Sequence, residues 1–451
     1  MLHTKKITLR FINELKSKSH IMEIIRGSAV GFIVKALGAM GIFLMNIAIA
    51  RSLGSTESGV FFLAFTIITF LSAFSRMGLD NTVVRFIAAC SENNEIRSLH
   101  HVLLTAFIWA ISMSVVVAIT LFMSADFISE HILRQPGLGA VLKKITLSIP
   151  LITGYFLLSM ALQGLKKIAL SMVILNVIVP ICVFISLHFI CVQTALDTSL
   201  LYIGSCFIAF CFGVFCWYRI SPQITEDQSV INKRIIWSSS FPLWGATVLN
   251  QISLCFSQLM LGYWSSSDAV AFFATAQRTA MLISFILVAV NAIAAPKFSA
   301  LHTTGDSAAL KDVAMGSVRL MMLAAFPVLV IMLLFPEYLM GLFGPGFKVG
   351  AFALQILAVG QFINVATGSV GVLLMMTGHE RLLRFNVFIG AVWGMVIGFI
   401  LIPRYGLIGA AIATTTAIAS QNLLGVIQVK RVLGFNNMAF WKVLPNEDLV
   451  R

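Results

Sequence analysis

Long apolar runs with almost no charged side chains recur along the whole sequence. About twelve are long enough to cross the roughly 30 Å hydrocarbon core of a bilayer, and their soft edges allow eleven to fourteen. Hydrophobic residues make up 59% of the chain and charged residues 11%, against about 45–50% and ~25% in a soluble domain. A fold of 451 residues cannot bury that much apolar surface against itself. The sequence therefore predicts an all-α, polytopic membrane protein, with runs beginning near Ala29, Gly59, Val102, Ile145, Ala169, Ser199, Phe241, Val270, Ser317, Ala351, Phe385 and Leu407.

Lysine and arginine are distributed unevenly between alternate loops. With the N-terminus inside, 23 of the 31 lie on inner segments, six lie on outer segments and two lie within spans. Cytoplasmic loops carry such an excess of basic residues. Both termini are therefore predicted to be cytoplasmic. Topology and anionic inner-leaflet lipid explain the net charge of +13, so no nucleic acid partner is indicated.

A weak internal repeat divides the chain into two parts. The segment STESGVFFLAFTI, beginning at Ser55, aligns with SSDAVAFFATAQR, beginning at Ser266. Six helices per half is an even number, so the halves would share one orientation and be related by a pseudo-two-fold axis along the membrane normal. We expect two six-helix bundles, at residues 28–220 and 237–431, joined by a cytoplasmic linker at 221–236. Residues 1–27 are predicted to form a basic cytoplasmic arm, either an interfacial helix or disordered, and residues 432–451 a cytoplasmic tail.

Two basic residues fall inside predicted spans, and no acidic residue does. They are Lys35 in the first span and Arg278 in the eighth. A charged side chain at mid-membrane costs roughly 2.5–3.5 kcal/mol on the insertion scale. Snorkelling to the interface is one explanation. The other is a central cavity that carries two positive charges and accepts an anionic, phosphate-bearing ligand, because a guanidinium fork matches phosphate oxygens.

Other polar residues near the spans extend this candidate site. Arg76, Asp80 and Arg85 cluster at the inner end of the second span, where the first two form either an ordinary i, i+4 ion pair or, with Arg85, a basic vestibule for a lipid diphosphate. Amides that would contact sugar, or else form packing hydrogen bonds between helices, are Gln277, Asn250, Gln251, Gln361 and Asn364.

Catalytic and metal-binding patterns are missing from the sequence. It contains no G-x-x-x-x-G-K-[ST] motif, no metal-ligand spacing among its eight histidines and no C-x-x-C pair among its seven cysteines. Outer loops are shorter than roughly twenty residues, and the carboxylates at helix mouths are too isolated to activate a glycosyl acceptor. We therefore expect no metal, no cofactor and no enzymatic activity.

Three motifs, in order, resemble one transporter family. IARSLGSTESGVFFLAFTI resembles its Ala-Arg-x-Leu-Gly-x-x-x-x-Gly signature between the first two helices. FFATAQRTAMLISFILVAVNAIAAPKFSAL is similar to its eighth-helix pattern Tyr-x-x-Ala-x-Arg … Pro-x-x-Ser-x-Leu. The third segment, IPRYGLIGAAIATTTA, is similar to the C-terminal Ile-Pro-x-Tyr-Gly pattern that leads into Gly-Ala-Ala-x-Ala-Thr. The family is that of the lipid-linked oligosaccharide (O-antigen or polysaccharide, Wzx-like) flippases of the multidrug/oligosaccharidyl-lipid/polysaccharide (MOP) superfamily.

The resemblance implies a function as well as a fold. It implies a MATE-like, V-shaped pair of bundles that moves an undecaprenyl-diphosphate-linked glycan across a bacterial cytoplasmic (inner) membrane by alternating access. Arg278 falls on the basic residue of the eighth helix, and Arg51, Gly54 and Gly59 fall on the outer-turn signature. The triplet Glu57-Ser58-Gly59 departs from the acid-Tyr-Gly that is usual before the second helix, and Phe273 replaces the usual tyrosine of the eighth-helix pattern. The candidate partners are the glycan lipid, the bilayer, a coupling ion (H⁺ or Na⁺) and other polysaccharide-assembly membrane proteins.

The leading hypothesis is a flippase in which Arg278 and Lys35 hold the diphosphate. Arg51, Gly54, Glu57, Gly59 and Asp80 are the expected gate or structural residues. The alternatives are a MATE-like cation or drug antiporter, which the missing intramembrane acids disfavour, and a membrane glycan polymerase or ligase, which the short outer loops disfavour.

Overall fold

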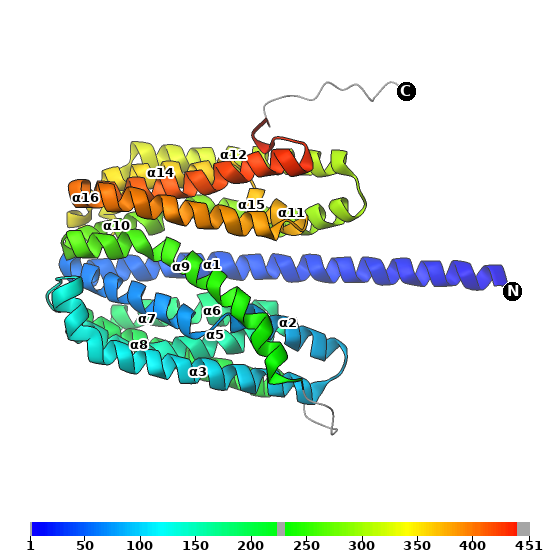
Figure 1. Ribbon diagram of the computed structural model, residues 1–451, viewed down its shortest axis with the longest axis horizontal. Coiled ribbons are helices and arrows are strands. Elements are labelled where there is room, and N and C mark those ends of the chain that lie inside the picture. Colours follow the sequence, from blue (N-terminus) through cyan, green and yellow to red (C-terminus); the bar gives the residue numbers. More distant parts are fainter. Residues whose placement is uncertain (1, 223–230, 440–451) are drawn as a thin grey trace.

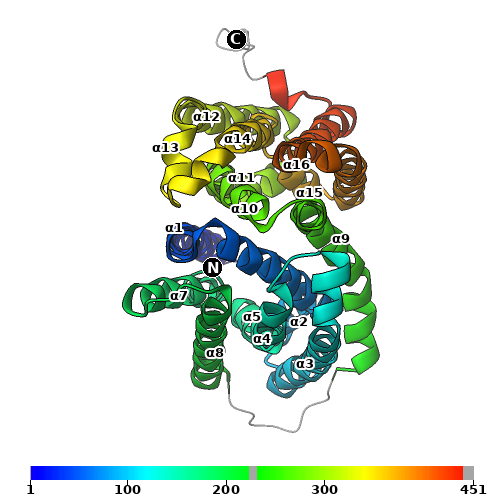
Figure 2. The same cartoon turned by 90° about the vertical axis from the view of Figure 1, so that its left-hand side faces the viewer.

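The computed structural model describes residues 2–222 and 231–439, and side chains from Val34 onward. Every regular element in these residues is a helix. The helices form two bundles, one above and one below a long first helix in Figure 1, and the view in Figure 2 shows the two as separate layers. This arrangement confirms the all-α, two-bundle fold predicted from the hydropathy pattern.

The first bundle, called the N half below, runs from the first helix to α8. Its first two spans form one helix broken at Gly54, where φ is 72° and ψ is −174°, values that suit glycine. The elements of the N half are α1 (Leu2–Ser75), α2 (Leu79–Glu92), α3 (Ile96–Phe127), η1 (Ile128–Ile132), α4 (Leu138–Ile145), α5 (Ser148–Gly164), α6 (Ile168–Asn176), α7 (Ile178–Phe189) and α8 (Ala195–Ile220).

The second bundle, called the C half, begins with α9 and ends with a helix broken at Gly406, where φ is 49°. Its elements are α9 (Lys233–Trp264), α10 (Ser267–Ala280), α11 (Leu282–Thr303), α12 (Ser307–Leu334), α13 (Pro336–Gly341), η2 (Pro345–Gly350), α14 (Ala351–Ala366), α15 (Val370–Met376), α16 (Glu380–Leu433) and η3 (Asn437–Ala439).

Within the described residues, eight helices are long and apolar enough to cross a membrane, or nine if the bent pair α4 and α5 counts as one span. Two of them, α1 and α16, are each two spans joined at a glycine break. Adding the more polar 32-residue α9 gives the twelve predicted spans. The loops near Gly54, Gln135 and Ser265 lie at the end predicted to face outside, called the outer end below; the opposite end is the inner end.

The structure strengthens the evidence for an internal repeat. Left-handed residues end equivalent helices in the two halves: Asn94 (φ 56°) and Gly305 (φ 75°) are 211 residues apart, and Lys166 (φ 62°) and Gly378 (φ 80°) are 212 apart. The helices that follow these turns, α3 and α12 in one case and α6 and α16 in the other, keep the same offsets. Matching turns therefore reveal a repeat that the low residue identity leaves weak.

The buried apolar side chains form one shared cluster and two separate ones. The shared cluster joins both halves, mostly toward the outer end, and includes Phe62 of α1 with Phe273 of α10. A second cluster fills the inner end of the N half, around Leu79 and Leu99, and a third, around Phe298, fills that of the C half. The hydrophobic core is therefore continuous at the outer end and divided at the inner end.

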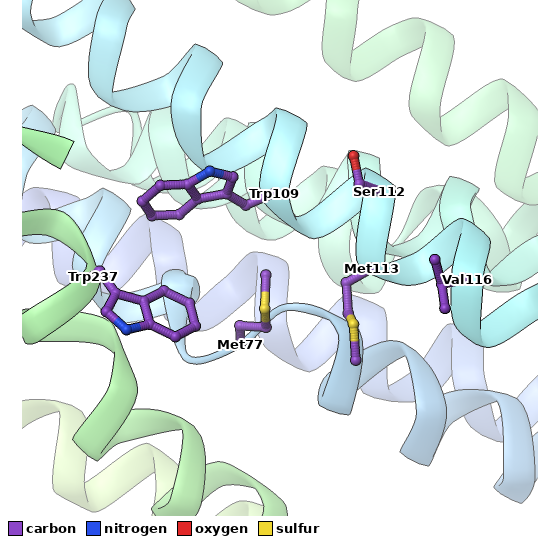
Figure 3. Close-up of a pocket in the computed structure, with 6 residues that line it drawn as sticks. All are labelled: Met77, Trp109, Ser112, Met113, Val116 and Trp237. Carbon is purple, nitrogen blue, oxygen red and sulfur yellow. The ribbon is translucent and has the colours of Figure 1, made fainter. Parts of the chain in front are cut away.

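Helix α9 connects the halves in a second way. Its first turns leave the C half and run beside α3, as Figure 2 shows on the right, and Trp237 meets Trp109 edge to face with ring centroids 5.7 Å apart (Figure 3). Ile236, within the predicted linker, is fully buried in the inner cluster of the N half. Residues 223–230 of that linker lie outside the described part of the chain. Residues 2–27, the predicted basic arm, continue α1 as helix. Their side chains, on which the prediction of an interfacial helix depends, lie outside the described part of the chain.

Candidate functional site

Backbones of the two halves approach closely at the outer end. A Cβ placed on Gly59 would lie 1.9 Å from the carbonyl oxygen of Ser267, far inside contact distance. Only glycine allows α1 and α10 to come this near. The predicted structural role of Gly59 therefore has a physical basis in this contact, which closes the outer end.

Gln135 ties the same region together through its side-chain amide. Its Nε2 donates to the carbonyl oxygens of Gly262 at 2.8 Å and Ser265 at 2.7 Å, and its Oε1 accepts a 2.5 Å bond from Ser267 Oγ. This buried side chain lies in the loop before α4 and completes the hydrogen bonding of the turn between α9 and α10. Nothing in the sequence pointed to Gln135, because one glutamine in a loop is unremarkable until its partners are known.

The residues of the outer-turn signature make different contacts. Arg51 Nε donates to the carbonyl oxygen of Leu342 at 2.7 Å, which joins the two halves. Gly54 supplies the left-handed turn between the first two spans. Glu57 Oε2 accepts a 2.7 Å bond from the backbone N–H of Ala195, at the first turn of α8, where a negative charge is stabilising. Glu57 thus acts within the N half, and among the described residues it forms no hydrogen bond or ion pair across the outer end.

Arg278 lies where the halves meet near mid-membrane. It is the eleventh residue after the start of α10, roughly 16 Å along the helix. Its Nη1 donates a hydrogen bond to Asn46 Oδ1 of α1. Its guanidinium carbon lies 4.2 Å from the ring centroid of Phe62 and 5.6 Å from that of Phe65. No carboxylate in the described part of the chain forms an ion pair with it.

These contacts change the energetic account of Arg278. A hydrogen bond to a charged donor contributes about 1.5–3 kcal/mol, and a desolvated cation–π contact up to about 2 kcal/mol. Together they are comparable with the roughly 2.5–3.5 kcal/mol insertion cost. From the sequence, either snorkelling or a bound phosphate could offset that cost. In the structure Asn46 and Phe62 already do so without a ligand.

Lys35 does not share this site. It is exposed on α1, eleven residues before Asn46, which is roughly 16 Å along the helix axis. That separation is far longer than a diphosphate group. The structure does not bring Lys35 beside Arg278, and their joint binding of one diphosphate stays a prediction.

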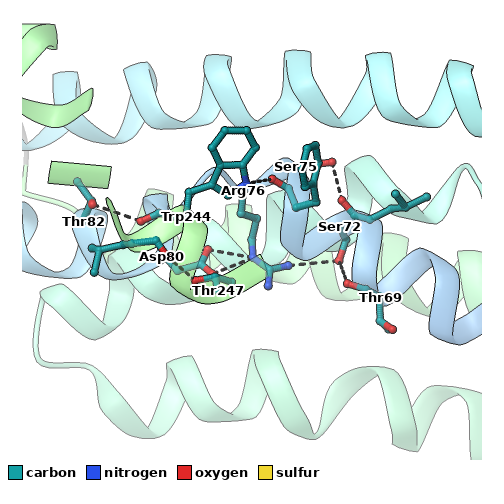
Figure 4. Close-up of polar contacts among 12 residues, drawn as sticks. Thr69, Ser72, Ser75, Arg76, Asp80, Thr82, Trp244 and Thr247 are labelled. Carbon is teal, nitrogen blue, oxygen red and sulfur yellow. Dashed lines mark hydrogen bonds and ion pairs between the residues drawn. The ribbon is translucent and has the colours of Figure 1, made fainter. Parts of the chain in front are cut away.

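Arg76 and Asp80 form the predicted i, i+4 ion pair, and the pair is buried (Figure 4). Arg76 Nε lies 2.9 Å and 3.0 Å from the two carboxylate oxygens, and its Nη1 donates to Ser72 Oγ at 3.3 Å. The guanidinium carbon is also 3.9 Å from the ring centroid of Phe156. Burial raises the pKa of Asp80, and the charge of Arg76 acts in the opposite direction. Arg76 uses Nε and Nη1 for contacts within the protein, which favours the structural alternative over a vestibule.

The turn between α1 and α2, which begins at Arg76, is contacted by helix α9 of the C half. Trp244 Nε1 of α9 donates a 2.9 Å bond to the carbonyl oxygen of Phe74, and the two rings are 5.0 Å apart. Gly78, at φ 69°, has no room for a side chain, because a Cβ would lie 2.4 Å from the carbonyl oxygen of Ser240. The α1–α2 turn and the first part of α9 therefore form a second inter-half contact, at the inner end.

The remaining candidates are dispersed. Arg85 is exposed on α2 and Asn250 is exposed on α9, whereas Gln277 is half-buried beside Arg278. Gln361 Oε1 accepts a hydrogen bond from Ser284 Oγ, which in turn accepts a 3.4 Å bond from Asn364 Nδ2. The last two amides therefore form packing hydrogen bonds between α11 and α14, one of the two uses expected of them.

A family model described as polysaccharide biosynthesis protein matches residues 24–302. An uncharacterized membrane protein of Methanocaldococcus jannaschii is 24% identical over 82% of this chain and 77% of its own length. Agl15 of Haloferax volcanii, assigned as a low-salt glycan biosynthesis flippase, is 24% identical over 89% and 83%. A protein of Shigella flexneri assigned as an O-antigen transporter is 20% identical over 83% and 90%.

Solved structures share the fold. An inward-facing MATE multidrug transporter of the MOP superfamily superimposes with a TM-score of 0.74 at 15% identity, covering 92% of this chain and 100% of that one. The lipid II flippase MurJ, in an inward closed conformation, gives 0.73 at 14% identity, covering 90% and 87%. The chain is therefore a multi-pass membrane transporter, not an enzyme, and it belongs to the polysaccharide biosynthesis protein family with the fold of the MOP superfamily.

Proposed function

We infer that this protein moves an undecaprenyl-diphosphate-linked oligosaccharide, such as an O-antigen or polysaccharide repeat unit, from the inner to the outer leaflet of a bacterial cytoplasmic membrane. Both termini would be cytoplasmic. The observation that carries the proposal is Arg278, a cation at the junction of the halves whose partners are an amide and aromatic rings rather than a carboxylate. The names of the Agl15 and O-antigen relatives support the same cargo class.

The chemistry of Arg278 suits a diphosphate. A guanidinium has five N–H donors, and one of them is used by Asn46. A phosphate oxygen carries negative charge and accepts bidentate bonds, which makes it a stronger partner than an amide oxygen. An arriving diphosphate would therefore displace Asn46 and keep the aromatic contact with Phe62. A cationic drug would meet repulsion at the same place, which disfavours the antiporter alternative.

The division of the hydrophobic core supports entry of the substrate from the inner side. The halves share a hydrophobic cluster at the outer end and have separate clusters at the inner end, where the start of α9 is the described contact between them. Displacing Asn46 would also remove a hydrogen bond between α10 and α1, the two helices that meet at Ser267 and Gly59. Ligand binding would thereby weaken the contacts that close the outer end, and this would favour the outward-open state of the alternating-access cycle.

A flipping assay in proteoliposomes tests the proposal. Arg278→Ala should reduce transport of the lipid-diphosphate-linked glycan at least tenfold, whereas Arg278→Lys should retain part of it, since charge survives without the bidentate fork. Arg404→Ala, which removes an exposed cation from α16, is the matched control. Wild-type transport by Arg278→Ala, or proton-driven ethidium efflux without glycan flipping, would refute the assignment.

A further inference from the structure

A lateral pocket lies between α3 and α9 at the inner end of the contact between the halves. It has a volume of about 370 Å³ and is lined by Met77, Trp109, Ser112, Met113, Val116 and Trp237. That volume is within the range of small-molecule sites. Figure 3 shows the two indole rings on one side, with the Met77 and Met113 side chains beside them. One lining residue comes from the α1–α2 turn, so the pocket borders the contact made by Gly78 and Trp244.

The walls of this pocket are chemically suited to a long hydrocarbon chain. Trp109 and Trp237 meet edge to face, and methionine side chains adapt to irregular apolar shapes. Val116 lies seven residues beyond Trp109 on α3, so the lining extends roughly 10 Å along that helix. An elongated apolar surface parallel to a transmembrane helix matches an extended chain better than a compact ligand.

The inner mouth of the pocket carries positive charge. Lys233 and Arg234 are both exposed on the first turn of α9, and they precede Trp237 by four and three residues, which places them near its face of the helix. Lys233 also lies close enough to His101 of α3 to interact with it electrostatically. Basic residues at the cytoplasmic end of an apolar groove complement a phosphate-bearing lipid.

Trp109 and Trp237 do not hydrogen-bond to each other. Within the described residues neither indole N–H donates a hydrogen bond to the protein; Trp109 is half-buried and Trp237 is 40% exposed. Trp109 lies seven residues beyond Val102, where the third span is predicted to begin, which is roughly 10 Å along the helix.

We propose that this pocket holds the polyprenyl chain of the lipid-diphosphate-linked cargo as it enters from the inner leaflet. The idea rests on the proposed flippase function and adds a separate site for the tail. The basic mouth takes the diphosphate first, and the chain lies against Trp109, Met113 and Val116. Because Met77 precedes Gly78, a chain in the pocket presses on the turn that α9 contacts, so tail binding and opening of the inner contact are linked.

Photo-crosslinking in nanodiscs tests where the chain binds. The probe is a C55 polyprenyl diphosphate with a diazirine on the chain, and labelled peptides are identified by mass spectrometry. Labelling should concentrate on residues 109–116 and 237 and should fall at least fivefold with excess unlabelled C55 diphosphate. Equal labelling at Phe122, an exposed residue further along α3, or equal competition by phosphatidylglycerol, would mean ordinary lipid contact and would overturn the proposal.

A matched pair of filling variants gives a second test. Val116→Trp would occupy the pocket, whereas Ile119→Trp adds the same side chain to the same helix outside it; the two residues are 58% and 55% exposed. We expect Val116→Trp to reduce photolabelling and to raise the KM for a C55-linked glycan about tenfold, with little change for a short-chain (C10) analogue. Equal effects of the two variants would refute the site. If no variant or wild-type protein flips glycan but labelling still maps to the pocket, the transport assignment fails and the chain site stands.

Discussion

Ser267 Oγ donates a 2.5 Å hydrogen bond to Gln135 Oε1, which joins a loop of the N half to the first residue of α10. Together with the two bonds from Gln135 Nε2, it makes the glutamine a side-chain lock at the outer end. The contact is buried, so breaking it leaves polar groups without partners.

Gln135→Ala should therefore favour opening of the outer end. Leaving buried groups unsatisfied costs about 1–3 kcal/mol, which corresponds to a shift of at least about fivefold in the closed-to-open equilibrium. Double electron–electron resonance between spin labels on the outer ends of α3 and α12 measures that shift. Lys143→Ala, which removes an exposed ion pair with Asp126 inside the N half, is the control and should leave the distance distribution unchanged.

Gly59→Ala should block closure of the same end. Its Cβ would lie 1.9 Å from the Ser267 carbonyl oxygen, so the helices must separate. We expect a strong loss of glycan flipping and trapping in an outer-open state, visible as increased labelling of cysteines placed near Ser265. Gly204→Ala on α8, where nothing lies within 4 Å, should transport normally. Normal transport by Gly59→Ala would show that the close approach is dispensable.

Asn46→Asp should inhibit transport by giving Arg278 an internal carboxylate. The charged pair would compete with a phosphate for the same donors, so half-saturation by the lipid diphosphate should need at least tenfold more substrate. Asn176→Asp is the control, because Asn176 is bonded within α6, to the Met172 carbonyl oxygen at 3.1 Å. Unchanged substrate affinity in Asn46→Asp would indicate that the anion binds elsewhere.

The Arg76–Asp80 pair is expected to be structural. Removing one member of a buried pair costs about 3–5 kcal/mol, whereas an apolar replacement of both is often neutral. Asp80→Ala should lower the melting temperature in detergent, and Arg76→Met with Asp80→Leu should restore most of it. If the stable double variant cannot flip glycan, the pair has a role in transport after all.

Trp244→Phe should loosen α9 from the α1–α2 turn. The substitution keeps an aromatic ring beside Phe74 but removes the N–H that donates to its carbonyl oxygen, a loss of about 1 kcal/mol. Hydrogen–deuterium exchange should increase in the first turns of α9. Trp393→Phe, at a largely exposed residue of α16, should leave that exchange unchanged; equal protection in both variants would contradict the contact.

Local patterns in the sequence predicted much of this molecule. Span lengths, the glycine turn at Gly54 and the i, i+4 pairing of Arg76 with Asp80 each depend on residues close together in the chain. The partner of Arg278 could not be predicted from local patterns, because Asn46 is 232 residues away. A single asparagine in an apolar helix does not indicate which distant residue it contacts. Gln135 was missed for the same reason. Lys35 was assigned to the site of Arg278 because charge counting gives the number of intramembrane ions but not their levels.

The sequence places Ile236 in the linker between the halves, but its side chain is buried in the inner hydrophobic cluster of the N half. The first bundle therefore cannot complete its hydrophobic interior until the ribosome has made the start of α9. A protein divided into two fragments at residues 223–230 would leave that interior short of a side chain, whereas a cut after Ser240 would keep Ile236 with the cluster it fills. The unit that assembles first during membrane insertion thus extends past the boundary that the repeat defines.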